Sequence, residues 1–478
     1  MANLKPIVMK FGGTSVADAR AFERVADIVD AQLELRPVVV VSAMSGMTNA
    51  LVDAVRLAGD SQPQAAAAVL EPHYLRHLAV AEELLFKEAR ETVLLIKRAR
   101  AEVVELVELI AQQQGTNAAF RDAVLSYGEQ LSSILLAAIL RERRMAAQQV
   151  DARRCLITDE EFGCAIPLMT VTQGRTQAVL GPLLDQSFVP VLGGFIGSTL
   201  KGETTTIGRG GSDYTAAIIG SALAAREIQI WTDVTGVLAA DPRVVAAART
   251  IPRLSYAEAA ELAYFGAKVL HPKTMQPAVE GGIPVRICNS LAPEEEGTLV
   301  CAESETTRHT VKAIAHKAGV TTVQVSSARM LGAYGFLRAL FEVFERHRTI
   351  VDVVTTSEVS VSLSLDDAGA LPAIVAELEE LGTVRVENER AIVCVVGEGL
   401  RGTPGIAARV FNTISDINVT MISQGASSIN LTFVIEEERV AEAVIRLHEA
   451  FFGESQVSSF KSQVLSSGAL ILVAQPES

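Results

Sequence analysis

Residues 5–16 contain the residue types that could bind a phosphate group. A short apolar strand is predicted over residues 6–9, and Lys10 follows it directly. Gly12 and Gly13 then form a turn ahead of a helical pattern. Glycine lets backbone N–H groups approach an anion closely, and a helix N-terminus adds positive potential. The alternative is an ordinary strand–turn–helix with a solvated lysine, since the segment matches neither the common phosphate loop nor the dinucleotide fingerprint.

A second glycine-rich segment, residues 204–215, offers groups that could hold an anion. It places Arg209, Ser212 and Asp213 within five residues of one another, among glycines. A guanidinium can donate two parallel hydrogen bonds to a carboxylate, and glycine-turn N–H groups can add more. A glycine loop with Ser212 as a helix cap is the simpler interpretation, but the density of polar groups favours a binding function.

Other polar residues interrupt apolar or helical patterns. Glu129 follows a glycine at what the pattern indicates is a helix start, where it is either a cap or a contact for a substrate amine. Thr232 and Asp233 follow a predicted strand. Lys268 and His271 lie near a predicted helix end, and we interpret His271 as a capping or core residue.

Composition bounds the class of protein. The chain has 478 residues, which suggests two to four domains, and 49% of them are hydrophobic. A formal net charge of -14 argues against nucleic acid or an anionic membrane as the main partner. The five cysteines are scattered and lack C-x-x-C spacing, which predicts buried thiols without a disulfide frame or protein metal site. With no signal-peptide pattern and no long apolar run, we expect a soluble, cytoplasmic protein.

The elements that must position these residues follow an α/β pattern. Apolar runs at 6–9 and 37–41 flank a helical pattern at 19–35, which predicts a β-α-β unit in a parallel sheet. Ligands bind beyond the carboxyl ends of such strands, where both the turn after Met9 and the turn at 42–49 lie. Residues 50–147 are helical in pattern. Within them, 81–113 predict an amphipathic hairpin that packs on the sheet or covers a site.

The last third of the chain changes character after a polar stretch, 298–312, which is predicted to be a linker. Strand and helix patterns in the order β-α-β-β-α-β occur over residues 313–390 and begin again over 391–453. Paired modules of this kind suggest ligand sensing, dimerisation or both. The tail, 454–478, contains an apolar run at 469–474 that could add a strand to the first module.

Four motifs together carry a family resemblance. Lys10-Phe-Gly-Gly-Thr-Ser, Gly208-Arg-Gly-Gly-Ser-Asp, Trp231-Thr-Asp-Val with Asp241-Pro-Arg, and Phe265-Gly-Ala-Lys-Val-Leu-His-Pro occur in order. From about residue 5 to about residue 452 the chain resembles the aspartate kinase (aspartokinase) family. The resemblance implies an amino-acid-kinase fold over 1–300, three-layered with a mainly parallel sheet. Two ferredoxin-like ACT domains over 313–390 and 391–453 would follow.

The resemblance also implies roles for individual residues. The catalytic pair would be Lys10 and Asp213. Aspartate would contact Thr48, Glu129, Arg209 and Ser212. ATP would contact Lys10, Gly12, Gly13, Thr232, Asp233, Leu238, Arg243 and Lys268. The C-terminal half looks most like the monofunctional, lysine-sensitive type, and its effector set would be Met330, Phe336, Leu337, Val351, Asp352, Ser357 and Glu358. Two positions depart from the family: Leu238 replaces a common tyrosine, and Ala333 replaces a serine found in some lysine-inhibited relatives.

The implied activity is phosphorylation of the side-chain carboxylate of L-aspartate by ATP with Mg²⁺. The product would be 4-phospho-L-aspartate, on the route to lysine, threonine and methionine, with lysine as feedback inhibitor and a homodimer or higher oligomer formed through the ACT domains. The attacking carboxylate has a pKa of about 4 and needs no general base. Two alternatives stay open: a kinase for glutamate, N-acetylglutamate or a nucleotide, and a catalytically dead amino-acid sensor. The presence of Lys10 and Asp213 argues against the sensor.

Overall fold

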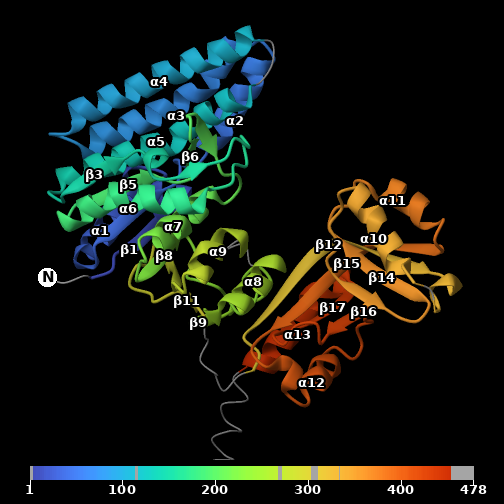
Figure 1. Cartoon of the computed structure of the whole chain (residues 1–478). Coiled ribbons are helices and arrows are strands. Elements are labelled where there is room, and N and C mark those ends of the chain that lie inside the picture. Colours follow the sequence, from blue (N-terminus) through green and yellow to red (C-terminus); the bar gives the residue numbers. More distant parts are fainter. Residues whose placement is uncertain (1–3, 114–116, 267–271, 303–309, 333, 454–478) are drawn as a thin grey trace, which may run out of the picture. The chain divides into compact units, whose positions relative to one another are not determined.

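The computed structural model describes residues 4–113, 117–266, 272–302, 310–332 and 334–453 (Figure 1). The chain forms two compact units. The first comprises Met1–Val237, Thr250–Ala260 and Lys268–Glu305, and the second comprises Leu238–Arg249, Glu261–Ala267 and Thr306–Ser478. The sequence prediction had given residues 1–300 to one domain, whereas the structure groups two short segments of that range with the second unit.

An eight-stranded sheet organises the first unit, in the order β3-β5-β2-β1-β8-β10-β11-β9. Its strands are β1 (Ile7–Phe11), β2 (Pro37–Val41), β3 (Ala147–Val150), β5 (Val189–Gly193), β8 (Glu227–Thr232), β9 (Arg253–Ser255), β10 (Val285–Asn289) and β11 (Thr298–Cys301). All neighbours pair in parallel except β10 with β11. The central strands β1 and β2 are buried along their whole length, as continuous apolar runs in a doubly covered parallel sheet require. Strand β11 lies within the stretch that was predicted to be a linker, so that prediction was wrong at its start.

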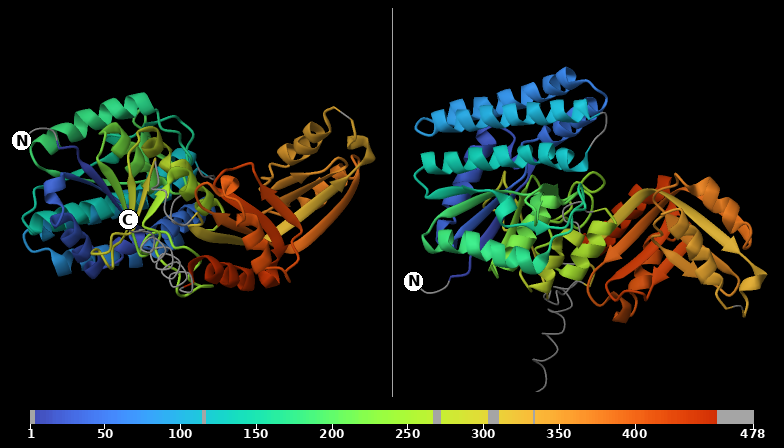
Figure 2. Two further views of the ribbon diagram at one scale, coloured as in Figure 1. Left: turned by 90° about the horizontal axis from the view of Figure 1, so that it is seen from below. Right: turned by 45° about the horizontal axis from the view of Figure 1, so that its top comes forward.

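Helices cover this sheet in layers. They are α1 (Ala19–Asp30), α2 (Met47–Gly59), α3 (Pro63–Leu84), α4 (Ala89–Gln112), α5 (Ala118–Glu142), α6 (Met169–Asp185), α7 (Gly211–Ala222), α8 (Tyr256–Tyr264, which ends in the second unit) and α9 (Pro272–Glu280). Figures 1 and 2 show α3 and α4 as a hairpin stacked outside α5, with α5 next to the sheet. The hairpin predicted over 81–113 was wrong in its bounds, because that range holds only the end of α3 and the helix α4, whereas the observed hairpin comprises the whole of α3 and α4. It packs on α2 and α5.

Helix α5 is the central helix of the first unit. It is long and apolar enough to pass a test for a membrane span, but most of its apolar stretch is buried inside the unit, as expected for a core helix. The sequence pattern had placed Glu129 at a helix start, and that prediction was wrong because Glu129 lies in the middle of α5. The glycine before it is a packing position: a Cβ on Gly128 would lie 2.8 Å from the Cβ of Ala43.

A small second sheet, β4-β6-β7, lies within the same unit. Its strands are β4 (Ile157–Thr158), β6 (Ile196–Thr199) and β7 (Thr204–Thr206). Strand β7 leads through residues 207–210 into α7, which begins at Gly211, so Ser212 is the second residue of the helix and not its cap. The turn before α7 and the first residues of the helix therefore carry the predicted anion-binding residues.

The second unit contains a six-stranded sheet in the order β13-β14-β12-β15-β17-β16. The strands are β12 (Ala313–Ser326), β13 (Val354–Thr356), β14 (Ser360–Leu365), β15 (Thr383–Val396), β16 (Met421–Gln424) and β17 (Asn430–Glu436), and the helices are α10 (Phe336–Arg346), α11 (Leu371–Leu378), α12 (Ile406–Thr413) and α13 (Val440–Phe452). Two apolar clusters form its core, one beneath α10 and α11 and one beneath α12 and α13.

The long strands β12 and β15 join the two halves of this sheet. Their pairing runs from Ala313–Val396 to Ser326–Thr383, with a bulge near Val320. The sequence pattern had ended one module at 390 and begun the next at 391, whereas the single strand β15 runs through that boundary. One half of each long strand belongs to each apolar cluster. The strand predicted at 469–474 lies outside the described residues.

Candidate active site

The carboxyl end of β1 brings a lysine into contact with a carboxylate from α7. Lys10 is the fourth of the five residues of β1, whereas the sequence had placed it directly after the strand. It is 9% exposed. Its Nζ lies 2.6 Å from Oδ1 of Asp213, without the alignment of a hydrogen bond. An ammonium has three N–H donors, so the contact with Asp213 leaves Lys10 able to donate to an anion in the pocket as well.

The turn after β1 packs tightly against the turn after β2. A Cβ on Gly13 would lie 2.8 Å from the carbonyl oxygen of Ala43, so only glycine fits there. Gly12 donates its N–H to the carbonyl of Trp231, the penultimate residue of β8. Ser15 hydrogen-bonds Ser290 through their hydroxyls at 3.0 Å. These contacts fix the turn rigidly between neighbouring strand ends.

Glu129 reaches the same place from the opposite direction. Its side chain extends from the middle of α5, is 4% exposed, and has one oxygen, Oε2, with no hydrogen-bond partner. Burial raises the pKa of Glu129 to about 8, and the N–H of Ala43 partly offsets this effect. A buried carboxyl with an unpartnered oxygen in a pocket is a binding site for a cation.

The N-terminus of α7 provides the anion-binding side. Gly210 is the N-cap with φ +73°, and Ser212 and Asp213 lie in the first turn. Among the described residues, Arg209 has no ion-pair or hydrogen-bond partner and is exposed, so its guanidinium is free to hold a carboxylate. The N–H groups at the start of α7 also attract an anion, because a helix N-terminus carries positive potential.

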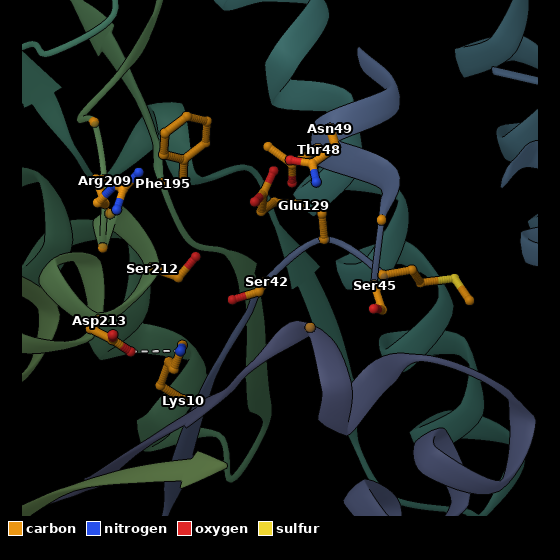
Figure 3. A pocket seen from close by; sticks show the side chains of 17 residues that line it. Lys10, Ser42, Ser45, Thr48, Asn49, Glu129, Phe195, Arg209, Ser212 and Asp213 are labelled. Carbon is orange, nitrogen blue, oxygen red and sulfur yellow. Dashed lines mark ion pairs between the residues drawn. The ribbon is translucent and has the colours of Figure 1, made fainter. Parts of the chain in front are cut away.

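These elements surround one pocket of about 400 Å³ (Figure 3). In Figure 3, Glu129 lies beside Thr48, Arg209 lies across the pocket from them, and Lys10 and Asp213 form a pair next to Ser212. The structure therefore brings together seven predicted site residues: Lys10, Gly13, Thr48, Glu129, Arg209, Ser212 and Asp213. A small zwitterion with an additional carboxylate would find a carboxyl group, a guanidinium and an ammonium around it.

Other predicted ATP contacts are not in this pocket lining. Gly12, Thr232 and Asp233 lie at the neighbouring strand ends, where the Thr232 hydroxyl donates to Oδ1 of Asp233 at 3.1 Å. Leu238 and Arg243 belong to the segment grouped with the second unit, and Arg243 pairs there with Asp241 at 2.6 Å. Lys268 and His271 lie outside the described residues. The assignment of these residues to ATP stays a prediction.

Several residues that line the pocket were not assigned a role from the sequence. Among them are Ser42, Ser45, Asn49 and Phe195. The serines and Asn49 follow β2 in the small-residue turn that the sequence had placed at the ligand-binding edge, so position at a strand end was the available signal. Phe195 has no comparable signal, because an apolar side chain after a buried strand is ordinarily core.

The predicted effector residues gather in one half of the second unit. Met330, Phe336 and Val351 pack against the apolar cluster beneath α10 and α11. Leu337 is 42% exposed. Ser357 and Glu358 lie in the exposed turn between β13 and β14. This grouping is compatible with a shared site, which stays a prediction.

Asp352 of the effector set is already paired inside the protein. Its side chain is 1% exposed, Oδ2 lies 3.4 Å from Nζ of Lys317, and Oδ1 accepts a hydrogen bond from the hydroxyl of Tyr264. Lys317 also pairs with Asp366 and lies over the Tyr264 ring at 4.8 Å from its centroid. Burial and the neighbouring Asp366 raise the pKa of Asp352 to about 6. A basic effector would have to replace Lys317 at this carboxylate.

The sequence matches known families and proteins along most of its length. Residues 5–289 match the amino acid kinase family, and residues 393–451 match an ACT domain. The lysine-sensitive aspartokinase 3 of Escherichia coli is 41% identical over 93% of this chain and 99% of its own length. The chain belongs to the aspartokinase family. The chloroplastic aspartokinase 1 of Arabidopsis thaliana is 37% identical over 98% of this chain and 84% of its own length.

Solved aspartokinases share the fold. The structure of E. coli aspartokinase III with aspartate and ADP covers 94% of this chain and 100% of its own, with 40% identity and a TM-score of 0.77. The structure of the same enzyme with lysine and aspartate gives 40% identity and a TM-score of 0.78, covering 94% and 99%. These matches confirm the predicted amino-acid-kinase fold followed by ACT regions. They favour this family over the other amino-acid kinases that the sequence left open.

Proposed function

We propose that this aspartokinase transfers the γ-phosphoryl group of ATP to the side-chain carboxylate of L-aspartate, giving 4-phospho-L-aspartate and ADP. The observation that carries the proposal is the pocket in which Glu129, Arg209 and Lys10 converge. Two related solved structures are complexes with aspartate, and one of them also contains ADP. The arrangement of charges here matches such a pair of substrates.

Glu129 and Arg209 would orient aspartate by its backbone groups. The Glu129 carboxylate accepts hydrogen bonds from the α-ammonium, and the Arg209 guanidinium donates two to the α-carboxylate. Thr48 and Ser212 add hydroxyl contacts. With both ends of the amino acid held, the side-chain carboxylate is directed toward Lys10. Positioning of this kind accounts for much of the rate in phosphoryl transfer.

The chemical step is a displacement at phosphorus. A carboxylate oxygen forms a bond to the γ-phosphorus while the bond to the β,γ-bridging oxygen breaks, and ADP leaves with that electron pair. The nucleophile, with a pKa of about 4, is already ionised near neutral pH, so no protein base is needed. The obstacle is repulsion between anions. Lys10, anchored by Asp213 at 2.6 Å, and the N–H groups of the Gly12–Gly13 turn reduce that repulsion.

The donor set fits a magnesium ion that arrives with the nucleotide. Among the described residues, no three acidic, histidine or cysteine side chains gather as a metal site. Mg²⁺ in kinases is commonly held by one or two carboxylates together with substrate phosphates. Asp213 is the acidic side chain beside Lys10 that could contribute, and the ion would supply further charge neutralisation at the phosphates.

The second unit would carry feedback regulation and assembly. We infer that lysine inhibits through the effector set around Asp352, and that the chain forms a homodimer or higher oligomer through its ACT regions. The lysine-sensitive relative and the lysine complex of aspartokinase III support the effector. A cytoplasmic location fits the core position of α5, the membrane-length helix among the described residues.

A substrate panel tests this function. ADP release from ATP is measured with L-aspartate, L-glutamate, N-acetyl-L-glutamate and a nucleoside monophosphate, each with and without lysine, threonine and methionine. Release that depends on aspartate and is inhibited by lysine is the expected result. Release with another substrate in place of aspartate would assign the pocket to a different kinase. No release with any of them would favour the sensor.

The pH dependence of aspartate binding should follow Glu129. Because burial raises its pKa to about 8, the carboxylate that binds the ammonium becomes scarcer as pH falls. Well below that pKa, the KM for aspartate should rise about tenfold per pH unit, and it should level off above it. Initial rates at saturating ATP between about pH 6.5 and 8.5 measure this dependence. Glu129→Gln should have a high KM for aspartate that does not change with pH. A KM for aspartate that is independent of pH in the unmodified enzyme would refute the role of Glu129 in binding the ammonium.

Lysine inhibition should be weakened by removing carboxylates of the effector set. Glu358→Ala removes an exposed acid without disturbing packing, and Asp352→Ala removes the buried one. In each variant the lysine concentration for half inhibition should rise at least about tenfold, as expected for one lost charge-assisted hydrogen bond. Glu380→Ala, an exposed acid outside the set, is the matched control. Unchanged inhibition in both effector variants would remove lysine from this site.

A further inference from the structure

A carboxylate outside the pocket, Asp122, is buried without a charged partner in contact. It lies on α5 and is 0% exposed. Its Oδ2 accepts hydrogen bonds from the N–H of Gly163 and the N–H of Thr206, both at 2.7 Å, while Oδ1 is buried without a partner. Burial raises the pKa of Asp122, and these two N–H groups act against that effect. Burying a carboxylate costs free energy. We therefore look for the role of Asp122 in the backbone segments to which it is hydrogen-bonded.

The two N–H groups belong to the segments behind the Arg209 turn. Thr206 is the last residue of β7, and Gly208 follows two residues later. Gly163 lies directly behind Gly208: a Cβ on Gly208 would be 3.6 Å from the carbonyl oxygen of Gly163. Asp122 therefore holds the backbone of the Arg209 turn at two points, once through the strand that enters it and once through the loop that supports it.

Asp122 also stands in a fixed relation to Glu129. The two residues are seven apart on α5, about two helical turns, so they project from the same side of one helix. Glu129 enters the pocket, whereas Asp122 does not line it. One rigid helix thus carries the group that holds the ammonium and the group that fixes the turn bearing Arg209.

We propose that Asp122 is a positioning residue for aspartate, which sets the place of Arg209 relative to Glu129 without touching either substrate. The inference rests on the proposed function, because it assigns the two ends of aspartate to those two residues. Loss of the carboxylate leaves the buried N–H of Thr206 and the partly buried N–H of Gly163 without this partner and frees the turn to move. The main consequence falls on aspartate, since the backbone of Lys10 and of the turn after it is held by pairing with β2 and β8.

The main test is Asp122→Ala. The KM for aspartate should rise at least about tenfold, because a displacement of about 1 Å in a positioning group can cost on the order of a hundredfold. The KM for ATP should stay within about twofold of the unmodified enzyme, since uniform loss of structure would change both. Steady-state kinetics with each substrate varied, together with the thermal midpoint, give both readouts.

Two conservative variants separate positioning from general stability. Asp122→Asn keeps an oxygen that can accept both N–H groups, and it should restore the KM for aspartate to within about threefold. Asp122→Glu keeps the charge but is one methylene longer, so it should displace the turn and raise the KM for aspartate severalfold. If the alanine variant cannot be purified, the comparison of the asparagine and glutamate variants decides the question.

The matched control is on the same helix. Glu142, at the other end of α5, accepts hydrogen bonds from the N–H groups of Phe86, Lys87 and Glu88 at 2.8–3.1 Å. Glu142→Ala should lower the thermal midpoint and leave both KM values unchanged. Activity of the unmodified enzyme in the same assay tests the proposed function separately. The ratio of the KM for aspartate in the variant to that in the unmodified enzyme tests the role of Asp122. An unchanged aspartate KM in a folded alanine or glutamate variant, or equal rises for aspartate and ATP, would overturn the proposal.

Discussion

Replacing Lys10 by alanine is expected to lower kcat at least about a hundredfold, the usual loss for one preorganised electrostatic group. Lys10 is the cation at the carboxyl end of β1, and its partner is 2.6 Å away on α7. Without it, Asp213 would face the nucleotide phosphates uncompensated, so the variant loses an attraction and gains a repulsion. The KM for aspartate should change little, because other residues hold the ends of the amino acid.

The measurement is kcat by ADP release at saturating aspartate and ATP. A thermal melt of the same variant shows that the fold is retained. Lys5→Ala, which removes an exposed lysine before β1, controls for loss of positive charge and should leave kcat unchanged. A near-normal kcat in the Lys10 variant would exclude the lysine from charge neutralisation in the chemical step.

Arg209→Ala should raise the KM for aspartate at least about a hundredfold while kcat falls much less. Two hydrogen bonds to a charged group contribute about 1.5–3 kcal/mol each, and about 1.4 kcal/mol corresponds to a factor of ten. Arg209 is exposed in the turn before α7, so its removal should not destabilise the fold. Arg209→Lys keeps the charge but loses the two-pronged geometry, and an intermediate KM is expected.

Arg175→Ala is the control for this prediction, because Arg175 is an exposed arginine on α6 outside the pocket. It should leave the KM for aspartate unchanged. If Arg209→Ala lowers kcat and kcat/KM equally with no change in KM, the guanidinium acts in the transition state and does not bind the ground-state carboxylate.

The parts of the site at strand ends could be predicted from the sequence. Residues 37–41 form a fully buried strand, and the turn that follows it lines the pocket, as the apolar run and small-residue turn had indicated. Lys10 was found for the same reason. In a parallel sheet, a residue that follows an apolar run lies at the carboxyl edge of the sheet. The local sequence pattern is therefore enough to place it near the ligand site.

Other parts depended on packing that no local pattern reports. The Ser126–Glu129 segment was read as a helix start because of its glycine, but Gly128 is small so that α5 can approach Ala43. Asp122 was not singled out, because a polar residue in a helix is ordinarily solvated. The long pairing of β12 with β15 joins residues that are about 60 to 80 positions apart. Each of these features arises from contacts between distant segments.

The most direct test of the account identifies the product. The enzyme is incubated with ATP, Mg²⁺ and L-aspartate in the presence of hydroxylamine, which converts an acyl phosphate to a stable hydroxamate and releases phosphate. Mass spectrometry then locates the hydroxamate on the amino acid, and ADP is measured in parallel. We predict one side-chain hydroxamate for each ADP released, and formation at least about a hundredfold slower with the Lys10→Ala variant. A hydroxamate on the α-carboxylate, or ADP release without any hydroxamate, would contradict the assignment of Glu129 and Arg209 to the two ends of aspartate.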